Sequence, residues 1–204
     1  MGRLPWAPDG GLRDSMVSTG QTVIYGGSFN PPHMGHQMAC LYLIEALGAD
    51  QVWMLPAWVH PFGKVLEDFD HRVRMCRKLA APLGERVRVS EVEREVGGGG
   101  RTFDTLQHLI AAEPDRRFAL AVGTDILEET HAWHRWQDIQ QMVEIVVIGR
   151  QGFGPPVGGG LTLPEVSSSE IRARVARGGP ITGMVPTAVA DHIATHQLYR
   201  GTAT

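Results

Sequence analysis

Short apolar runs rich in β-branched residues alternate along the chain with longer segments whose apolar residues recur at helical spacing. Runs of the first kind predict buried strands, and segments of the second kind predict helices that pack on them. The predicted strands are Thr22–Tyr25, Val52–Leu55, Val87–Val92, Phe118–Val122, Val143–Ile148 and a last short strand, Leu161–Leu163. Alternation of this kind indicates an α/β fold, with a doubly wound parallel sheet between two helical layers in a three-layer αβα arrangement. A small helical part is expected at the C-terminus.

Three of the predicted helices bear on the argument. The first begins close to His33 and runs to Leu47 with few polar residues, as a helix lying flat on a sheet does. The second spans Asp70–Leu79, and its run of basic residues is expected to face solvent. That run consists of Arg72, Arg74, Arg77 and Lys78. The last helix is expected to open at Pro186, because proline suits the first helical position.

The composition is that of one globular domain: 204 residues, 43% hydrophobic and 20% charged, can bury a sizeable core. We expect a flexible extension over residues 1–21 and a single domain over residues 22–204. The net charge of −3 gives no electrostatic reason to expect nucleic acid or a membrane as a partner, and no stretch is apolar for long enough to span a bilayer. Cys40 and Cys76 lie in helical patterns and the extension lacks the apolar segment of a secretion signal, so we expect buried, reduced thiols in a cytoplasmic protein.

The stretch from Gly26 to His36 joins the first predicted strand to the first helix. Its glycines end the strand, and its two prolines exclude a helix until the second of them is passed. The N–H groups and the positive dipole end of the helix then meet at one point, which suits a phosphate. His33 and His36 lie three residues apart on the first turn and can point at the same anion. The stretch therefore predicts a polyphosphate site, whereas a zinc site would lack a third ligand nearby.

The same residues, GGSFNPPHMGH, resemble the signature of nucleotidyltransferases that carry a His-x-Gly-His motif, and among them the nicotinate mononucleotide adenylyltransferases of NAD synthesis. The resemblance continues, with gaps, from about residue 22 to about residue 200. It implies a Rossmann-like nucleotidyltransferase domain in which His33 and His36 are catalytic and contact the phosphates of ATP. His36 would touch the α-phosphate as charge builds in the transition state. The other ATP-binding residues implied in this stretch are Gly26, Gly27, Ser28, Phe29 and Gly35. Asn30 would contact the acceptor.

A second motif, VSSSEIR, ends at Arg172. Ser167 and Glu170 have capping-box spacing, which starts a helix and directs its first N–H groups outward. Arg172 presents five donors on a planar fork and can clamp phosphate oxygens. The motif resembles the family's Ile-Ser-Ser-Thr-x-Ile-Arg, with valine and serine at two positions. The resemblance implies that Ser168 and Ser169 bind ATP and that Arg172 is catalytic and holds the departing pyrophosphate.

The segment Pro56–Lys64 follows the second strand, and its prolines and glycine predict a surface loop. In the resembled family, a loop at this place ends in Pro-His-Lys, and its lysine faces the phosphates. Lys64 fits that catalytic role with the spacing changed by one residue. The alternative is a loop that only packs on the domain.

Two further positions match family motifs near the ends of predicted elements. Thr102 follows four glycines and matches a Tyr-Thr pair whose backbone holds the pyridine carboxylate or amide, although Arg101 replaces the tyrosine. After the fourth strand, Gly123 and Asp125 match a Gly-x-Asp that the family uses in the nucleotide site. From the residues alone, Asp125 is equally well explained as the N-cap of the helix that follows.

The run Ala132-Trp133-His134-Arg135-Trp136 is similar to the family's Thr-Trp-His-Arg-Trp, with alanine at the first position. The resemblance implies that Trp133 stacks on the pyridine ring of the acceptor and that Arg135 belongs to the same subsite. Without the resemblance, both tryptophans would be expected in the core.

These groups fit adenylyl transfer from ATP to nicotinate mononucleotide, giving deamido-NAD and pyrophosphate. The acceptor's phosphate is already a nucleophile at neutral pH, so catalysis consists mostly of positioning and of stabilising charge on the transferring phosphorus. Mg²⁺ is expected to enter with ATP. Nicotinamide mononucleotide and phosphopantetheine are alternative acceptors. A non-catalytic nucleotide sensor is the alternative of another class, and the presence of His33, His36 and Arg172 argues against it.

No resident metal site is predicted. His192 and His196 lie four residues apart on the last helix, but without a carboxylate or thiol partner they are expected to be surface histidines. The sequence leaves open the oligomeric state, with a homodimer as one option, and the preference between the two pyridine nucleotides.

Overall fold

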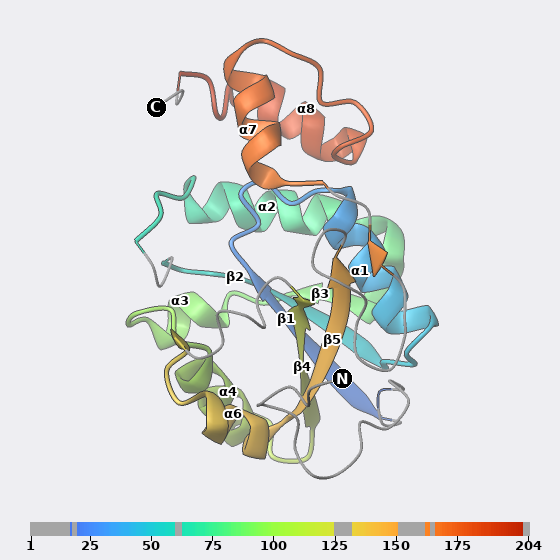
Figure 1. Ribbon diagram of the computed structural model, residues 1–204, viewed down its shortest axis with the longest axis vertical. Helices are drawn as coiled ribbons and strands as arrows, with labels where there is room; N and C mark the ends of the chain where they lie inside the picture. The colour runs from blue at the N-terminus through green and yellow to red at the C-terminus, as the bar shows by residue number, and fades with distance from the viewer. Residues whose placement is uncertain are drawn as a thin grey trace, which may run out of the picture.

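The computed structural model describes residue 17 and residues 20–59, 63–124, 132–150, 162–163 and 166–201. Its centre is a sheet in the order β3-β2-β1-β4-β5-β6 (Figure 1), and every neighbouring pair of strands is parallel. The strands are β1 (Gln21–Gly27), β2 (Gln51–Pro56), β3 (Val87–Val89), β4 (Arg117–Gly123), β5 (Glu144–Arg150) and β6 (Thr162–Leu163). The predicted α/β fold with a doubly wound parallel sheet is confirmed.

Helices cover both faces of this sheet (Figure 1). They are α1 (Met34–Glu45), α2 (Phe69–Ala80), the 3₁₀ helix η1 (Ala81–Arg86), α3 (Val92–Val96), α4 (Thr102–Ala112), α6 (Trp136–Met142), α7 (Ser168–Ala176) and α8 (Thr187–Thr195). One core cluster joins one face of the sheet to α1, α2, α7 and α8, and the second joins the other face to α3, α4 and α6. The two clusters are the two interfaces of the three-layer arrangement, and α7 and α8 form the C-terminal helical part.

Alternate strand residues supply the two clusters, as the two-residue period of a strand requires. In β1, Val23 packs in the cluster below α1 and α2, whereas Ile24 packs in the cluster below α4. In β2, Met54 and Leu55 divide in the same way. Because both faces of the sheet are covered, the central residues of the long strands are apolar, which is why these strands appear in the sequence as continuous apolar runs.

The order of the strands reverses beside β1. β2 pairs with one edge of β1 and β4 with the other, so the chain winds outward from this point in both directions. In such sheets, ligands bind beyond the carboxyl ends of the strands at the point of reversal. Here those ends are Gly27 of β1 and Gly123 of β4. A ligand site is therefore expected at the loops that follow these two glycines.

Several element boundaries differ from the prediction, mostly by one or two residues. The strand expected over Val87–Val92 ends at Val89, because the hydroxyl of Ser90 accepts from the N–H of Val92 at 3.3 Å and residues 92–96 turn into α3. Pro186 is the N-cap of α8 rather than its first residue. Within the expected extension, Val17 is buried and donates its N–H to the Leu47 carbonyl at 2.8 Å. Residues 1–16 lie outside the described part of the chain.

Two predictions about exposed side chains are wrong. Arg72 was expected on the solvent face of α2, yet it is 1% exposed, because its position lies on the same side of the helix as Cys76 and Leu79. His192 was expected at the surface of the last helix, yet it is 5% exposed and faces α2. In the residues that the structure describes, no helix combines the length and apolar character needed to cross a bilayer.

Candidate active site

The loop after β1 turns sharply around the ring of Phe29. Phe29 is 1% exposed and has a positive φ of 45°, which places its ring beneath the turn. A Cβ atom on Gly27 would lie 3.2 Å from that ring, so a larger residue here would press on the buried ring of Phe29. The ring of Phe29 meets the ring of His36 edge-on, with centroids 4.9 Å apart. The apolar ring thereby fixes one side of the His36 imidazole.

His33 and His36 lie side by side where α1 begins. Their rings stack with centroids 3.7 Å apart, and both residues are buried. The backbone N–H of His33 donates to Nδ1 of His36 at 3.0 Å. Because Nδ1 is an acceptor, the neutral ring of His36 carries its proton on Nε2. The side chain thus presents a donor of known position, which suits an anionic oxygen.

Helix α7 docks on the loop that precedes α1. The hydroxyl of Ser168 donates to the Pro31 carbonyl at 2.8 Å, and Nη1 of Arg172 donates to the Asn30 carbonyl at 2.7 Å. Nη2 of Arg172 donates to the hydroxyl of Ser169 at 3.3 Å. The two motifs predicted to share one site, although separated by more than half the chain, are therefore in contact.

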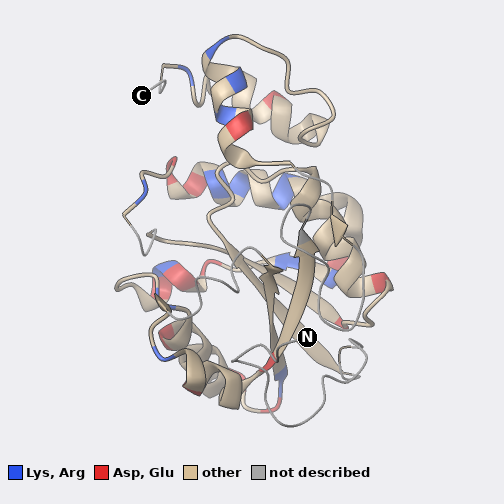
Figure 2. Ribbon diagram, in the orientation of Figure 1, with Lys and Arg blue, Asp and Glu red and all other residues tan. Residues whose placement is uncertain are grey.

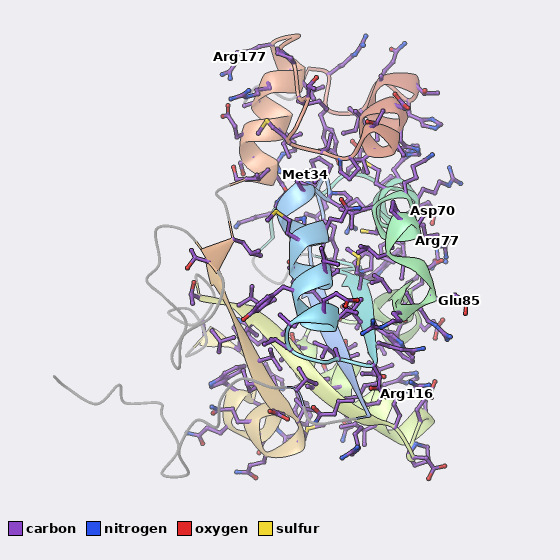
Figure 3. All side chains as sticks on the ribbon, turned by 90° about the vertical axis from the view of Figure 1, so that its right-hand side faces the viewer. Met34, Asp70, Arg77, Glu85, Arg116 and Arg177 are labelled. Carbon is purple, nitrogen blue, oxygen red and sulfur yellow. The ribbon has the colours of Figure 1, made fainter. Side chains whose placement is uncertain are left out.

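The predicted start of α7 is confirmed. The hydroxyl of Ser167 caps the helix by accepting from the N–H of Glu170 at 3.2 Å. Figure 3 shows Met34, at the start of α1, directly below α7. The N–H of Met34 donates to the Met184 carbonyl at 2.9 Å, so this N–H of the first turn serves the fold instead of an anion.

Asn30 connects three distant parts of the chain. Its side-chain oxygen accepts from the N–H of Glu67 at 3.2 Å and from the hydroxyl of Tyr199 at 3.1 Å. Burial raises the pKa of the Tyr199 phenol far above its ordinary value, so the hydroxyl stays protonated and donates. The role predicted for Asn30 was contact with the acceptor, and the structure shows its oxygen engaged within the protein.

Arg72 is a site residue that the sequence interpretation missed. Its Nη1 donates to the Ser28 carbonyl at 2.9 Å and its Nε donates to the Glu67 carbonyl at 2.8 Å. Burial lowers the pKa of the guanidinium, which nevertheless stays charged because arginine does not lose its proton in proteins. A cation therefore lies directly beneath the turn after β1. The signal in the sequence was the spacing of four and seven residues from Arg72 to Cys76 and Leu79.

Basic side chains lie along both helices that border this turn, despite the net negative charge of the chain. Figure 2 shows acidic residues at the beginning of α2 and α7 and basic residues after them. In both helices the acidic residue near the N-terminus complements the helix dipole. The basic residues give the region the local positive charge that a nucleotide site needs.

Lys64 is exposed in the segment before α2. It lines a cavity of about 590 Å³ together with Trp58, Phe69 and Arg72. Trp58 is 39% exposed and packs edge-on against Phe69, with ring centroids 5.0 Å apart. The predicted surface loop is thus confirmed for residues 57–59 and 63–64, whereas Pro56 is the buried last residue of β2. Lys64 shares a cavity with the arginine that holds the loop after β1.

Of the residues predicted for the acceptor, Thr102, Trp133 and Arg135 lie on the side of the sheet that carries α4, whereas Asn30 lies in the loop before α1. Thr102 is the first residue of α4, and the next residue, Phe103, packs beneath the guanidinium of Arg135 at 3.9 Å from its ring centroid. Trp133 meets Trp136 edge-on with centroids 5.4 Å apart. The structure therefore brings Thr102 and Arg135 to one place on the face of the sheet covered by α4 and α6, with Trp133 packed against the same core.

Two contacts hold this region in position. Gly100 has a φ of +64°, and a Cβ atom there would lie 2.6 Å from the Val59 carbonyl oxygen, so the glycine run touches the loop after β2. The carboxyl group of Glu93 accepts from the Thr105 hydroxyl at 2.7 Å. Burial raises the pKa of Glu93, and hydrogen bonds from Thr105 and from the backbone of Trp58 oppose that shift. The start of α4 is thereby linked to the loop that carries Lys64.

Of the Gly-x-Asp pair, Gly123 lies at the carboxyl end of β4, as predicted. Asp125 lies outside the described residues. A second cavity, of about 480 Å³, lies at the amino-terminal ends of β1 and β2 and is lined by Asp50 and Arg116. Figure 3 shows Arg116 at the end of the molecule opposite Met34, so this cavity is separate from the site.

The sequence matches a family model described as cytidylyltransferase-like over residues 24–174. Two similar proteins are the probable nicotinate-nucleotide adenylyltransferases of Anaeromyxobacter dehalogenans and Myxococcus xanthus. The first is 48% identical over 184 residues, which cover 89% of this chain and 97% of that protein. The second is 41% identical over 179 residues, which cover 88% of this chain and 94% of that protein.

Solved structures share the fold at low sequence identity. A nicotinic acid mononucleotide adenylyltransferase of Plasmodium falciparum, complexed with NaAD, has a TM-score of 0.74 at 19% identity and covers 88% of this chain and 97% of its own. A Vibrio parahaemolyticus protein described as a putative nicotinate-nucleotide adenylyltransferase has a TM-score of 0.70 at 21% identity, over 89% of this chain and 96% of its own. Both structures have the same arrangement of strands and helices over nearly their whole length.

Proposed function

Because this chain belongs to the cytidylyltransferase-like family and is 48% identical to a nicotinate-nucleotide adenylyltransferase over nearly its whole length, we propose that it catalyses the same reaction. It transfers the adenylyl group of ATP to nicotinate mononucleotide. The products are deamido-NAD and pyrophosphate. The structural observation that carries the proposal is the stacked pair His33 and His36 at the start of α1, beside the point where the strand order reverses.

In this reaction an oxygen of the mononucleotide phosphate attacks the α-phosphorus of ATP. A new P–O bond forms, and the bond between the α-phosphorus and the oxygen leading to the β-phosphate breaks. Pyrophosphate leaves with the electron pair of that bond. The attacking phosphate is already ionised at neutral pH, so the protein needs no base to activate it. Its task is to align the two phosphates and to stabilise the charge that develops on the leaving oxygens.

We assign the α-phosphate to His36 and the neighbouring phosphate oxygens to His33. The proton that the Nδ1 contact places on Nε2 of His36 supports this assignment, because a neutral imidazole donor of fixed orientation suits an oxygen that gains charge. Gly26, Gly27, Ser28, Phe29 and Gly35 shape the turn around these phosphates. The buried cation of Arg72 contributes a positive potential beneath them.

Arg172 and Lys64 are assigned to the β- and γ-phosphates and to the departing pyrophosphate. Arg172 is held at the site by the Asn30 carbonyl and has further N–H donors on its fork. Ser168 and Ser169 belong to the first turn of α7, where backbone N–H groups favour an anion. Lys64 is exposed beside the cavity that Arg72 also lines, which allows its ammonium group to reach an incoming polyphosphate.

The acceptor is assigned to the region at the start of α4. Trp133 would stack on the pyridine ring, Arg135 would face the acceptor's charge, and the backbone at Thr102 would hold the pyridine carboxylate. The packing of Arg135 on Phe103, directly after Thr102, supports one common subsite. A carboxylate at the end of the ring also agrees with the basic Arg101 beside it. Gly123 and Asp125 are assigned to the ATP side.

Mg²⁺ fits this site as a companion of ATP. The described groups that surround the turn after β1 are N–H donors and cations, which bind phosphate oxygens and not a metal ion. Such an ion is therefore held mostly by the phosphates and by water. When bound, it neutralises charge on the β- and γ-phosphates.

The proposal is tested by measuring pyrophosphate release from the purified protein with ATP and Mg²⁺ and with each of three acceptors. We expect turnover with nicotinate mononucleotide to exceed turnover with nicotinamide mononucleotide and with phosphopantetheine. Preference for one of the other acceptors would keep adenylyl transfer and contradict the assigned acceptor. ATP binding without pyrophosphate release from any of the three would contradict the enzyme and favour a nucleotide sensor.

The cysteines support placement of this activity in the cytoplasm. Cys40 and Cys76 are both buried and free, as predicted. Burial raises the pKa of the Cys40 thiol to about 12 and that of Cys76 well above its ordinary value, so both stay protonated and unreactive. Free thiols of this kind are typical of proteins in a reducing compartment.

A further inference from the structure

Three histidines meet where α8 packs on α2, and none of them is among the residues assigned to the reaction. His71 lies in the first turn of α2, and His192 and His196 lie one helical turn apart on α8. One ring nitrogen from each lies within 4.8 Å of the other two. Nδ1 of His71 and Nε2 of His192 are 3.0 Å apart. Figure 1 shows α7 and α8 together beyond α2, at the end of the molecule where the C-terminal part docks.

We propose that His71, His192 and His196 bind one divalent transition-metal ion of the zinc class, which joins α8 to α2. This site does not depend on the proposed adenylyl transfer. It would be a second ligand site with a separate task.

The spacing of the ring nitrogens fits a tetrahedral ion. Two nitrogens bound at about 2.1 Å to a tetrahedral zinc ion are roughly 3.4 Å apart. The pair from His71 and His192 is already near that spacing, at 3.0 Å. His196 is exposed, so its side chain has room to close the remaining distance. Three imidazoles leave a fourth position for water, as in known zinc sites with three histidine ligands.

The backbone that carries the three histidines is ordered before any ion arrives. Asp68 caps α2 by accepting from the N–H of Asp70 at 2.9 Å and from the N–H of His71 at 3.3 Å. On α8, the N–H of His196 donates to the His192 carbonyl at 3.1 Å, which keeps the two imidazoles on one side of the helix. The ligands therefore come from ordered helical backbone, which favours a defined coordination geometry.

The charge around the cluster selects the class of ion. Lys78 and Arg74 lie near His192 and are positively charged. The nearby ammonium and guanidinium groups oppose binding by charge alone, so hard cations such as Mg²⁺ and Ca²⁺ are disfavoured. Neutral imidazole ligands favour Zn²⁺, Ni²⁺, Co²⁺ or Cu²⁺.

An ion at this place would connect the C-terminal part to the layer that supports the site. Helix α8 is followed by Tyr199, which donates to Asn30 in the loop before α1. Helix α2 carries Arg72, which donates to Ser28 in the same loop. An ion that joins α2 to α8 closes this ring of contacts and stabilises the folded state, because the three ligands are close together only when the protein is folded.

The test uses the full chain without a polyhistidine tag, stripped of metal with a chelator that is then removed. Zn²⁺ is titrated in competition with a chromophoric chelator, and Co²⁺ is titrated with its visible absorption as the readout. The same measurements are made on His196→Ala and His71→Ala. His108→Ala is the matched control, because His108 is exposed on α4 and lies outside the cluster. Thermal unfolding is followed for each protein with and without Zn²⁺.

We expect one Zn²⁺ per chain and a Co²⁺ spectrum of tetrahedral intensity. Zn²⁺ at about 100-fold excess over its Kd should raise the Tm by roughly 5 to 10 °C. His196→Ala and His71→Ala should each weaken binding by at least about tenfold and remove the Tm shift, whereas His108→Ala should keep both. His196 is exposed, so its removal leaves the fold intact and keeps this result interpretable. Absence of stoichiometric binding in the native chain, or binding unchanged in both cluster variants, would overturn the proposal.

Discussion

The guanidinium of Arg72 donates to the carbonyl of Ser28 across 44 positions of sequence, at 2.9 Å. The same side chain also donates to the Glu67 carbonyl at 2.8 Å. Two carbonyls from separate loops therefore depend on one buried cation. Because both of these hydrogen bonds are to backbone carbonyls, we regard Arg72 as a positioning residue for the turn after β1, which we assigned to the ATP phosphates.

Arg72→Met is expected to lower the free energy of unfolding by about 2 to 4 kcal/mol, because two buried carbonyls lose a charged donor. It should also lower kcat by more than it raises the KM for the acceptor, since the displaced turn lies on the ATP side. Urea unfolding and steady-state kinetics measure the two effects. Arg74→Met, on the exposed side of the same helix, is the control and should leave both nearly unchanged. Equal behaviour of the two variants would contradict the role of Arg72.

His36→Ala removes the donor assigned to the α-phosphate. If the interaction strengthens in the transition state, kcat should fall by about 10²- to 10³-fold while the Kd for ATP changes by less than about tenfold. Pyrophosphate release measures kcat, and equilibrium titration measures the Kd for ATP. His108→Ala should match the native protein in both. A fall in ATP affinity as large as the fall in kcat would contradict a transition-state role and would show that His36 only binds ATP.

Gly100 and Gly98 distinguish two reasons for a glycine: a positive φ, and the lack of room for a Cβ atom. Both have positive φ, of 64° and 74°, but a Cβ atom on Gly98 meets nothing within 4 Å, whereas one on Gly100 lies 2.6 Å from the Val59 carbonyl oxygen. Gly98→Ala should cost about 1 kcal/mol of stability through its backbone conformation alone. Gly100→Ala should cost more and should also raise the KM for nicotinate mononucleotide, because Thr102 follows two residues later. Unchanged acceptor KM in Gly100→Ala would argue against an acceptor subsite at the start of α4.

His192 gives the stability of the fold a dependence on pH. Its pKa is lowered from an ordinary 6.5 to about 4, by burial first and then by His196, His71, Lys78 and Arg74. Above pH 6.5 the ring is neutral in both folded and unfolded chains. As the pH falls from about 6.5 to about 4, the unfolded chain takes up a proton that the folded chain resists, so stability is lost over this window.

Between pH 7.5 and about pH 5, His192 should lower the free energy of unfolding by on the order of 1 to 2 kcal/mol. Urea unfolding at both values measures it, with a chelator present so that no metal competes with the proton. The comparison is His192→Phe, which keeps a ring and removes the titration. The native protein should lose more stability than the variant over this interval. Parallel pH profiles for the two proteins would contradict a neutral, buried His192.

Helix α2 shows both the strength and the limit of sequence reasoning. Its boundaries follow from apolar spacing and were predicted within one residue of Phe69–Ala80. Its basic run was assigned to solvent as a group, which holds for Arg74, Arg77 and Lys78 and fails for Arg72. Arginine seldom lies in a core, so residue type outweighed helical position. The carbonyls that accept hydrogen bonds from Arg72 belong to loops outside α2, so the local sequence of the helix does not predict these contacts.

The site was predictable where its residues are neighbours in sequence. The turn before α1 and the cap of α7 are local patterns, and the structure has both. The contact between them rests on hydrogen bonds from Ser168 and Arg172 that only the fold creates. The histidine cluster was likewise predictable only where its residues are neighbours in sequence. His192 and His196 were recognised as a pair with metal-binding spacing, but His71, the missing third ligand, is 121 positions away.

The bond from Tyr199 to Asn30 spans 169 positions, so one of the last described residues completes a loop made near the beginning. A chain is synthesised from its N-terminus, and the turn after β1 therefore emerges long before its partner exists. The loop before α1 therefore cannot acquire its final contacts until Tyr199 has been made and has docked. A chain cut before Tyr199 would lose a hydrogen bond at Asn30, far away in sequence and next to the turn assigned to ATP.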